Sequence, residues 1–441
     1  MELARGPGSR RPRGDGGRLT AVVGRENTAP MAIDFTLPTD VDETRRRVRD
    51  FMESVVVPGE EKLYADGEPE RRDIVGFIVE SREAAQEWGV WLPHMPAEWG
   101  GLGLSITAMA FVSAEAARTA FGPFILNCQA PDEGNMHTLL HHASNEQKEH
   151  YLRPLVEGRA RSCFAMTEPE VAGSDPTGIR TSAVHDDATG EWVVNGHKWF
   201  ISGAHGAQFA ILIAKTDPDA EPPQASNSAF LVDLPAEGWE IVRDIDTMAG
   251  HGNHCEIRIT DLRIPDDRIL GGRGNGHLLG QARLGPARLA HCMRWIGQTE
   301  RALEMLVARA ESRELHGDAL AEKQAIQWMM ADSAMELYAA KLMVLHAAFK
   351  IERGLPFRQE VSFAKHHVAN MLWRVIDRAV QVHGALGYST DTPLERMLRH
   401  ARSARLVDGA DEVHQALIAR NVRAAFADDG SVRAATGDLD F

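Results

Sequence analysis

The sequence contains few cysteines and no long apolar run. Its 441 residues include four cysteines, at Cys128, Cys163, Cys255 and Cys292, and no two of them are close together. This spacing argues against a disulfide framework and against a CxxC zinc site. No stretch approaches about eighteen uninterrupted apolar residues, and no charged start is followed by an apolar run and a cleavage site. Neither a membrane helix nor a secretory leader is therefore expected, and the predicted location is the cytoplasm.

Three further classes of protein are disfavoured. The formal net charge of -15 argues against nonspecific binding to nucleic acid, which depends on surplus Lys and Arg. Gly100, Gly101 and Gly103 lack the flanking strand, helix and later acidic residue of a dinucleotide-binding fingerprint. Residues 251–255 hold two imidazoles and a thiol, but no second ligand cluster follows at zinc-like spacing, so we expect a polar turn and no metal site.

The length predicts two or three domains. The segment before Met31 is rich in Arg and Gly, which predicts disorder; it would also suit a transit peptide, but we favour an overextended start upstream of Met31. No repeat of solenoid period is visible. The predicted parts are a disordered tail (1–31), an N-terminal helical domain (32–160), a β domain (161–275), a C-terminal four-helix bundle (276–427) and a tail (428–441).

The division into these parts rests on the spacing of apolar residues along the chain. Helical spacing in the first part gives way to apolar or alternating runs at 209–213, 229–232 and 256–260, and helical spacing returns after Gly276. These patterns predict an α+β fold. Within residues 192–203, Asn195-Gly196 between two apolar runs predicts the turn of a β-hairpin.

Residues 163–175 form the most informative stretch, an apolar run followed by the Thr167-Glu168-Pro169 turn and then Gly173-Ser174-Asp175. Taken alone, it could be a capped turn at a sheet edge. Together with residues 192–203, however, it resembles the flavin-binding loop and strand of the acyl-CoA dehydrogenase family. Residues 96–103, before this loop, and residues 283–286 and 408–414, after it, also appear in family order. The likeness is greatest to the branch whose animal members fuse this domain to a kinase-like domain.

The resemblance implies an N-terminal helical domain, a central β-barrel or sheet domain, a C-terminal four-helix bundle, and FAD as cofactor. Phe200 stands where the family usually has a tryptophan stacked on the flavin, and one extra residue separates Pro169 from Gly173. Trp199, Phe200 and Ile201 could instead be ordinary strand-core residues. The implied flavin contacts in this part of the chain are Phe164, Met166, Thr167, Gly173, Ser174, Phe200 and Ser202.

A second group of flavin contacts comes, in the family, partly from a neighbouring subunit. The resemblance therefore implies a homodimer or homotetramer. Residues 381–387 are also predicted to be a helix end closed by Gly384 and followed by a loop. The implied contacts are Arg313, Gln324, Gln381, Val382, His383, Gly384, Ala385, Ala410, Asp411 and Glu412.

Asp408 matches the position of the family's catalytic base, where many members carry glutamate. A carboxylate in a dry pocket is a stronger base than in water. Asp408 could instead cap the last helix, but Asp411 is the better N-cap candidate. The resemblance places Ser174, Arg288 and Gly409 at the substrate, although Arg288 could also be an ordinary surface arginine.

The implied activity is the FAD-dependent α,β-dehydrogenation of a fatty acyl-CoA to trans-2-enoyl-CoA, as in β-oxidation. The carboxylate takes the α-proton, flavin N5 takes the hydride, and electrons pass to an electron-transfer flavoprotein. An oxidase of the same fold, acting on acyl-CoA or nitroalkanes, is one alternative. A noncatalytic relative that binds flavin or nucleic acid is another.

Overall fold

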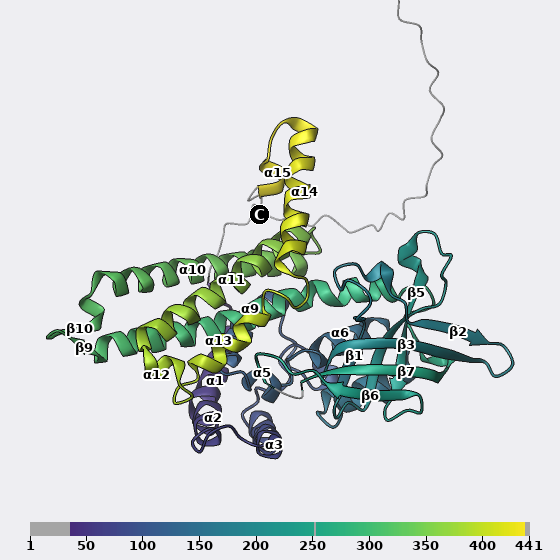
Figure 1. The fold of residues 1–441 in the computed structure, drawn as a ribbon, viewed down its shortest axis with the longest axis horizontal. Coiled ribbons are helices and arrows are strands. Elements are labelled where there is room, and N and C mark those ends of the chain that lie inside the picture. Colours follow the sequence, from purple (N-terminus) through teal and green to yellow (C-terminus); the bar gives the residue numbers. More distant parts are fainter. Residues whose placement is uncertain (1–35, 251–252, 437–441) are drawn as a thin grey trace, which may run out of the picture. The chain divides into compact units, whose positions relative to one another are not determined.

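The computed structural model describes residues 36–250 and 253–436. The predicted disordered tail, residues 1–31, lies outside the described residues. From Pro38 onward the described chain belongs to one compact unit, in which helices precede a sheet and a second set of helices follows it (Figure 1). This order confirms the predicted fold class. No helix in the described ranges is long and apolar enough to cross a membrane.

The N-terminal helices bury the apolar positions that predicted them. Val48, Phe51 and Met52 are fully buried, and the Ser105 hydroxyl caps α4 by accepting a hydrogen bond from the amide of Ala108 at 3.3 Å. The helices are α1 (Thr39–Phe51), α2 (Val57–Leu63), α3 (Arg71–Glu87), α4 (Ile106–Ala116), α5 (Gly122–Ile125), α6 (Asp132–His142), α7 (Asn145–Gln147) and α8 (Arg153–Val156).

The middle part is an eight-stranded sheet in the order β6-β7-β3-β2-β4-β5-β8, with β1 paired to β4. β4 is buried on both faces, because Phe209, Ile211 and Ile213 join the helical core while the alternate residues join the core of the sheet itself. The strands are β1 (Ser162–Ala165), β2 (Ser182–Asp186), β3 (Glu191–Ser202), β4 (Phe209–Lys215), β5 (Asn227–Asp233), β6 (Trp239–Asp244), β7 (His254–Pro265) and β8 (Ile269–Leu270).

The predicted hairpin at Asn195-Gly196 is wrong, because β3 runs through these residues as one strand. The Asn195 side chain instead exchanges hydrogen bonds with Asp261 on β7, where the register shifts. Gly196 is required by close packing, since a Cβ there would lie 2.3 Å from the Thr181 hydroxyl oxygen. The turn lies earlier, between β2 and β3, and contains Gly190 at φ 70°.

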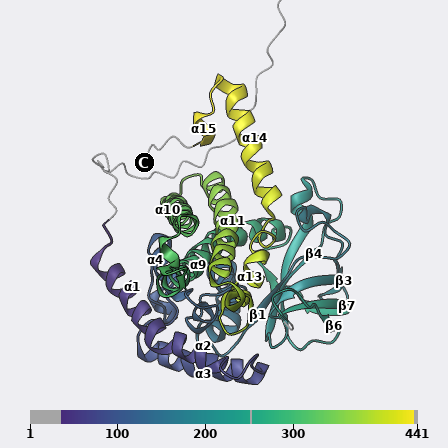
Figure 2. The same ribbon diagram turned by 60° about the vertical axis from the view of Figure 1, so that its left-hand side comes forward.

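The C-terminal helices pack beside the sheet (Figure 2). Gly384 ends α11 as predicted, but the short helix α12 follows it instead of a loop. The chain remains structured beyond the predicted bundle end at 427, since Ala435 is buried and its carbonyl accepts from the Gln359 amide at 2.8 Å. The elements are α9 (Gly276–Ser312), β9 (Glu314–Leu315), β10 (Asp318–Ala319), α10 (Gln324–Glu352), α11 (Arg358–His383), α12 (Ala385–Tyr388), α13 (Leu394–Ser403), α14 (Asp411–Asp429) and α15 (Arg433–Thr436).

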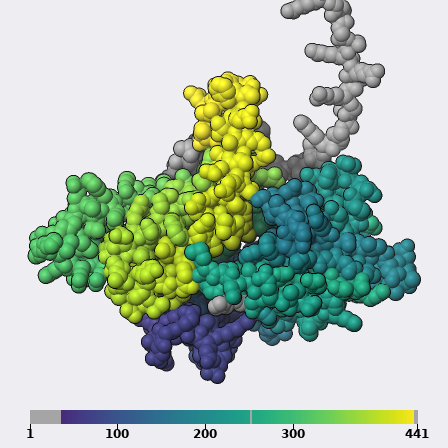
Figure 3. Space-filling model, in the orientation of Figure 1, coloured from purple at the N-terminus to yellow at the C-terminus, as the bar shows by residue number. Residues whose placement is uncertain are grey.

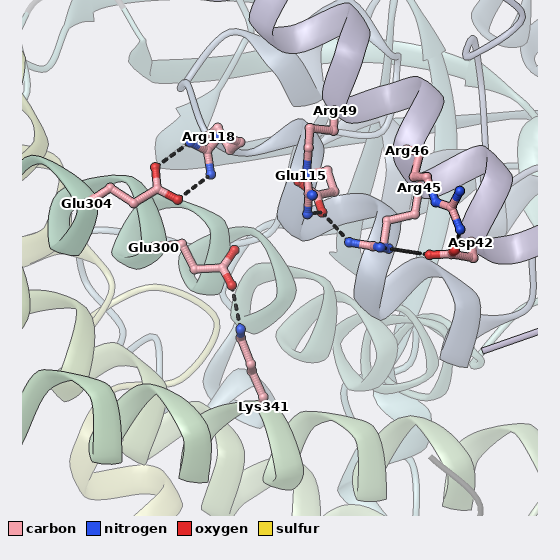
Figure 4. A network of polar contacts seen from close by, with 9 residues as sticks. All are labelled: Asp42, Arg45, Arg46, Arg49, Glu115, Arg118, Glu300, Glu304 and Lys341. Carbon is pink, nitrogen blue, oxygen red and sulfur yellow. Dashed lines mark hydrogen bonds and ion pairs between the residues drawn. The ribbon is translucent and has the colours of Figure 1, made fainter. Parts of the chain in front are cut away.

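Ion pairs join the N-terminal helices to the bundle (Figure 4). The buried carboxylate of Glu115 on α4 pairs with Arg45 at 3.0 Å and with Arg49, both on α1. On α9, Glu304 pairs with Arg118, which follows α4, and Glu300 pairs with Lys341 on α10. The drawn residues are Asp42, Arg45, Arg46, Arg49, Glu115, Arg118, Glu300, Glu304 and Lys341.

Candidate active site

The 163–175 loop is anchored by a buried ion pair. The Glu168 carboxylate accepts from Lys198 on β3 at 2.9 Å and from the Thr181 hydroxyl at 2.6 Å, while the Lys198 ammonium also donates to the Met166 carbonyl at 2.9 Å. Burial alone would raise the pKa of Glu168, but the charge of Lys198 and the bonds from Thr181 hold it below its ordinary value. Burial also lowers the pKa of Lys198 to about 8. Glu168 therefore fixes the loop to the sheet.

Thr167 ties the loop to the strand that follows. Its hydroxyl donates to the Trp199 carbonyl at 2.6 Å, and its own carbonyl accepts from the Trp199 amide at 3.0 Å. The hydroxyl proton is thus committed within the protein, which leaves this side chain as a hydrogen-bond acceptor. Gly173 and Ser174, further along the loop, are exposed.

Phe200 does not lie in the core. Its side chain is 45% exposed, whereas Ile201 beside it is buried, and its backbone adopts φ 52°. A bulky residue in the left-handed region is strained, and such strain concentrates at functional sites. Ser202, two residues on, shares a 2.9 Å hydrogen bond with Nδ1 of His254. The strand thus presents an aromatic face and a hydroxyl beside the 163–175 loop.

Helix α9 connects this loop to Asp408. Near its start, Gly280 faces the Met166 side chain, and the Arg283 guanidinium lies over the Phe164 ring with its carbon 4.2 Å from the ring centroid. Two turns later, Arg288 contacts the segment that carries Asp408. One helix therefore brings together residues from two parts of the sequence more than two hundred residues apart.

Asp408 lies in the segment between α13 and α14. It adopts φ 53°, followed by Gly409 at φ 106°. The Arg288 guanidinium donates through Nε to the Asp408 carbonyl at 2.7 Å, and the fully buried Lys365 donates to the Gly409 carbonyl, also at 2.7 Å. Lys365 also donates to the Ala404 carbonyl at 2.7 Å. Arg288 is thus a partner of this segment and not simply a surface arginine.

The Asp408 carboxylate faces His291, whose Nε2 lies 3.2 Å from Oδ2. Burial alone would raise the pKa of Asp408, but the side chain of His291 and the charges of Arg283 and Arg288 hold that pKa well below its ordinary value. The neighbouring charges keep the carboxylate ionised. The predicted strengthening of this base by a dry pocket depends on closure around thioester and flavin, and it stays a prediction.

The N-cap prediction for Asp411 is wrong by one position. Ala410 is the N-cap of α14 and Asp411 is its first residue. The buried Asp411 carboxylate accepts from Arg405 at 2.7 Å and from Asn370 at 3.0 Å, so it braces the segment internally. Glu412, next along the helix, is exposed to a greater degree than Asp411.

The second predicted group is divided: residues 410–412 directly follow Asp408, whereas its other members lie at the far end of the bundle. Arg288 and Arg313 are separated along α9 by about 37 Å at the ordinary helical rise, so Arg313 does not reach the Asp408 site of its own chain. Arg313, Gln324, Gln381, Gly384 and Ala385 are exposed there, near β9 and α12 (Figure 1), while Val382 and His383 are buried.

Within the described ranges, the side chains of His205, Asp244 and Cys255 offer ligand atoms within 4.8 Å of one another. His205 pairs with Asp244 at 2.7 Å, and the Cys255 thiol donates to the same carboxylate at 3.5 Å. Burial raises the pKa of Cys255 to about 11, so its thiol keeps its proton. These mutual hydrogen bonds account for the cluster. Residues 251 and 252 of the predicted polar turn lie outside the described residues.

Sequence reasoning missed four site residues: Lys198, Arg283, His291 and Lys365. His291 had a local signal, since it follows Arg288 by three residues and so shares its helix face. Lys365 had none, because it reaches the Asp408 segment only through the packing of α11.

Comparison with known families agrees with this architecture. Family models match for the acyl-CoA dehydrogenase N-terminal domain (residues 38–159), middle domain (163–262) and C-terminal domain (274–423). The fold and these matches define the class of the protein. It is an oxidoreductase whose chain has N-terminal helices, a middle sheet and a C-terminal helical bundle. The chain belongs to the acyl-CoA dehydrogenase family.

Individual relatives extend over most of the chain. It is 39% identical over 399 residues to probable acyl-CoA dehydrogenase FadE2 of Mycobacterium tuberculosis, covering 88% of this chain and 96% of that protein. It is 38% identical to mouse acyl-CoA dehydrogenase family member 10, covering 84% of this chain but only 36% of that longer protein. An acyl-CoA dehydrogenase structure from Mycobacterium abscessus superposes with a TM-score of 0.83 at 34% identity, covering 89% of this chain and all of that one.

Proposed function

We propose that this protein is an FAD-dependent dehydrogenase that converts a fatty acyl-CoA to its trans-2-enoyl-CoA. One observation carries the proposal: an ionised aspartate, Asp408, is held on a fixed segment and is joined through α9 to the 163–175 loop. Family membership supplies the reaction class.

The residues present fit a flavin. Phe200 offers an exposed aromatic face, Thr167 and Ser202 offer hydroxyl oxygens, and Gly173 and Ser174 expose a short polar backbone turn. These residues, with Phe164 and Met166, would hold the cofactor. When bound, FAD supplies the two-electron acceptor for the hydride that leaves the substrate β-carbon.

The protein's own task is to take the α-proton. Asp408 is ionised at neutral pH, as a proton acceptor must be, because nearby cations lower its pKa. Arg288 holds its carbonyl and Lys365 holds that of the next residue, Gly409, which sets where the carboxylate points. Aspartate is one methylene shorter than glutamate, so this positioning decides whether the carboxylate reaches the α-carbon. Ser174, Arg288 and Gly409 are the proposed substrate contacts.

A second subunit completes the proposed site. The remaining proposed cofactor contacts are Arg313, Gln324, residues 381–385 and residues 410–412. The first two lie too far along the bundle to reach a flavin beside the Asp408 of their own chain. This separation supports a homodimer or homotetramer, in which the far end of one chain's bundle reaches the flavin of another. Electron-transfer flavoprotein is the proposed electron acceptor, and the cytoplasm the proposed location.

Anaerobic mixing with a panel of acyl-CoA thioesters tests the proposal. The purified protein should carry FAD, and at least one thioester should bleach the flavin and yield the trans-2-enoyl product. Rapid oxygen consumption without another acceptor would assign an oxidase instead. A protein that takes up no FAD, or a flavin that no thioester bleaches, would contradict the proposed function.

A further inference from the structure

His291 has a polar partner on each side of its ring. Its Nε2 lies 3.2 Å from Oδ2 of Asp408, and its Nδ1 lies 3.2 Å from a terminal nitrogen of Arg294. A guanidinium has hydrogen-bond donors and no acceptor. Nδ1 must therefore accept from Arg294, and the proton of the neutral ring lies on Nε2, which faces Oδ2 of Asp408.

Arg294 is held in place independently of Asp408. It is almost fully buried, pairs with the buried Glu133 of α6 at 2.5 Å, and donates to the Cys128 carbonyl at 3.1 Å. The His291 ring also stacks on Trp295, with centroids 5.3 Å apart and an interplanar angle of 22°. The imidazole is thus fixed both in orientation and in tautomer by groups that do not belong to the Asp408 segment.

We infer that His291 is a positioning residue, which fixes the Asp408 carboxylate by donating an Nε2 hydrogen bond to Oδ2 and leaves Oδ1 to accept the substrate α-proton. The inference rests on the proposed function for the identity of that proton. Within the described chain, the carboxylate has no other hydrogen-bond donor. Because Nε2 already carries a hydrogen, a proton taken up by Asp408 cannot be placed between Oδ2 and the ring.

Charged groups on α9, α6 and α11 lie near this pair, and His414 of α14 faces Gly409, next to Asp408. A doubly protonated imidazole would turn an N–H toward the Arg294 donor, so the arrangement favours the neutral ring. The groups are Arg283, Arg288 and Arg294 on α9, Glu133 on α6, Lys365 on α11 and Asp408 itself.

Nuclear magnetic resonance tests the inference without turnover. In protein with 15N-labelled histidine, the His291 signal, assigned by its loss in His291→Gln, should show the proton on Nε2 and a bare Nδ1 at neutral pH. In 13C-aspartate protein, His291→Leu should raise the pKa of Asp408 by about one unit, because a bond to the ionised form is lost. The Nδ1-protonated tautomer, or an unchanged Asp408 titration, would overturn the inference even if no thioester proves to be a substrate.

Kinetics supply a second test. His291→Leu should slow anaerobic flavin reduction roughly 10- to 100-fold and shift the acidic limb of its pH profile upward, as expected for a lost bond to a charged group. His291→Gln keeps one donor and one acceptor and should recover most of the rate. His150→Leu, at an exposed ion pair with Asp233, is the control and should match wild type. If Asp408→Asn reduces slowly while His291→Leu keeps the wild-type rate and pH profile, the positioning role of His291 is rejected and the proposed role of Asp408 is not.

Discussion

At the scale of single residues, the buried pair of Glu168 and Lys198 determines the shape of the 163–175 loop. Each side chain is almost completely buried, and together they bond Met166 and Thr181. Removing one partner of a buried ion pair leaves the other charge uncompensated, which is far more destabilising than losing an exposed pair.

Glu168→Gln should lower the free energy of unfolding by about 3 kcal/mol at neutral pH. The pKa of Glu168 is lowered in the folded state, so its contribution is present above the ordinary value of 4.5 and is lost as pH falls through the folded pKa. Urea titrations at several pH values should therefore show the gap between wild type and variant shrinking below about pH 4.5. Glu170→Gln, at an exposed site, should stay within about 1 kcal/mol of wild type. A gap that grows in acid would contradict this assignment.

A buried histidine pair gives the N-terminal helical part a pH response. Burial lowers the pKa of His137 to about 3 from 6.5, and its Nε2 lies 3.0 Å from Nδ1 of His94. The unfolded chain binds this proton more readily, so stability should fall as pH drops from 6.5 toward 3. His137→Gln should flatten that part of a stability curve measured in urea. An equally steep decline in the variant would assign the acid sensitivity to other groups.

Which residues could be predicted from sequence follows from where their partners lie. Asp408 and the 163–175 loop could be proposed as site residues because each lies in a short stretch that resembles a family motif. Lys365 and Arg283 could not, because their roles arise from contacts between α11 or α9 and distant segments. Asn195-Gly196 misled because its side-chain bonds to Asp261 favour a continuous strand over a turn.

At the scale of elements, α9 contacts each part of the candidate active site. It contacts the 163–175 loop near its start, the Asp408 segment two turns later, and α4 further along. Its crossing with α4 depends on Gly297, where a Cβ would lie 1.9 Å from the Ala114 carbonyl oxygen. The helical period after Gly276 predicted α9 well, but no periodicity reveals which glycine permits a backbone to approach so closely.

Gly297→Ala should therefore destabilise the protein by about 3 kcal/mol, because the opposing atom is backbone and the two helices must separate. Gly76→Ala on α3 is the matched control, since nothing lies within 4 Å of its added Cβ. The control should gain about 0.5–1 kcal/mol from helix propensity. Thermal and urea unfolding of both variants measure the difference. Equal stabilities would show that α9 can shift without cost.

At the scale of the whole molecule, α10 exposes a row of apolar side chains. Trp328, Met335 and Tyr338 are 61%, 63% and 66% exposed, and their spacing places them near one helix face. Such a patch is typical of an interface. The C-terminal segment, drawn in yellow, adjoins the teal β domain (Figure 3). Arg399 on α13 donates to the carbonyl of Met248 in that domain at 3.1 Å.

Trp328→Glu should weaken the proposed dimer and, with it, the retention of FAD. Light scattering should give a mass of twice 48.5 kDa or more for wild type and a larger share of monomer for the variant. Val184→Glu, at an exposed site on β2, should leave the mass unchanged. A wild-type protein that is monomeric while saturated with FAD would contradict the shared site.

The claim that turnover depends on Asp408 is tested most directly by the rate at which an acyl-CoA bleaches the bound flavin without oxygen. Asp408→Asn preserves size but cannot accept the α-proton, so that rate should fall by roughly 10²- to 10⁴-fold. Asp428→Asn, exposed near the end of α14, should reduce as fast as wild type. Reduction of Asp408→Asn at the wild-type rate would show that another group takes the proton.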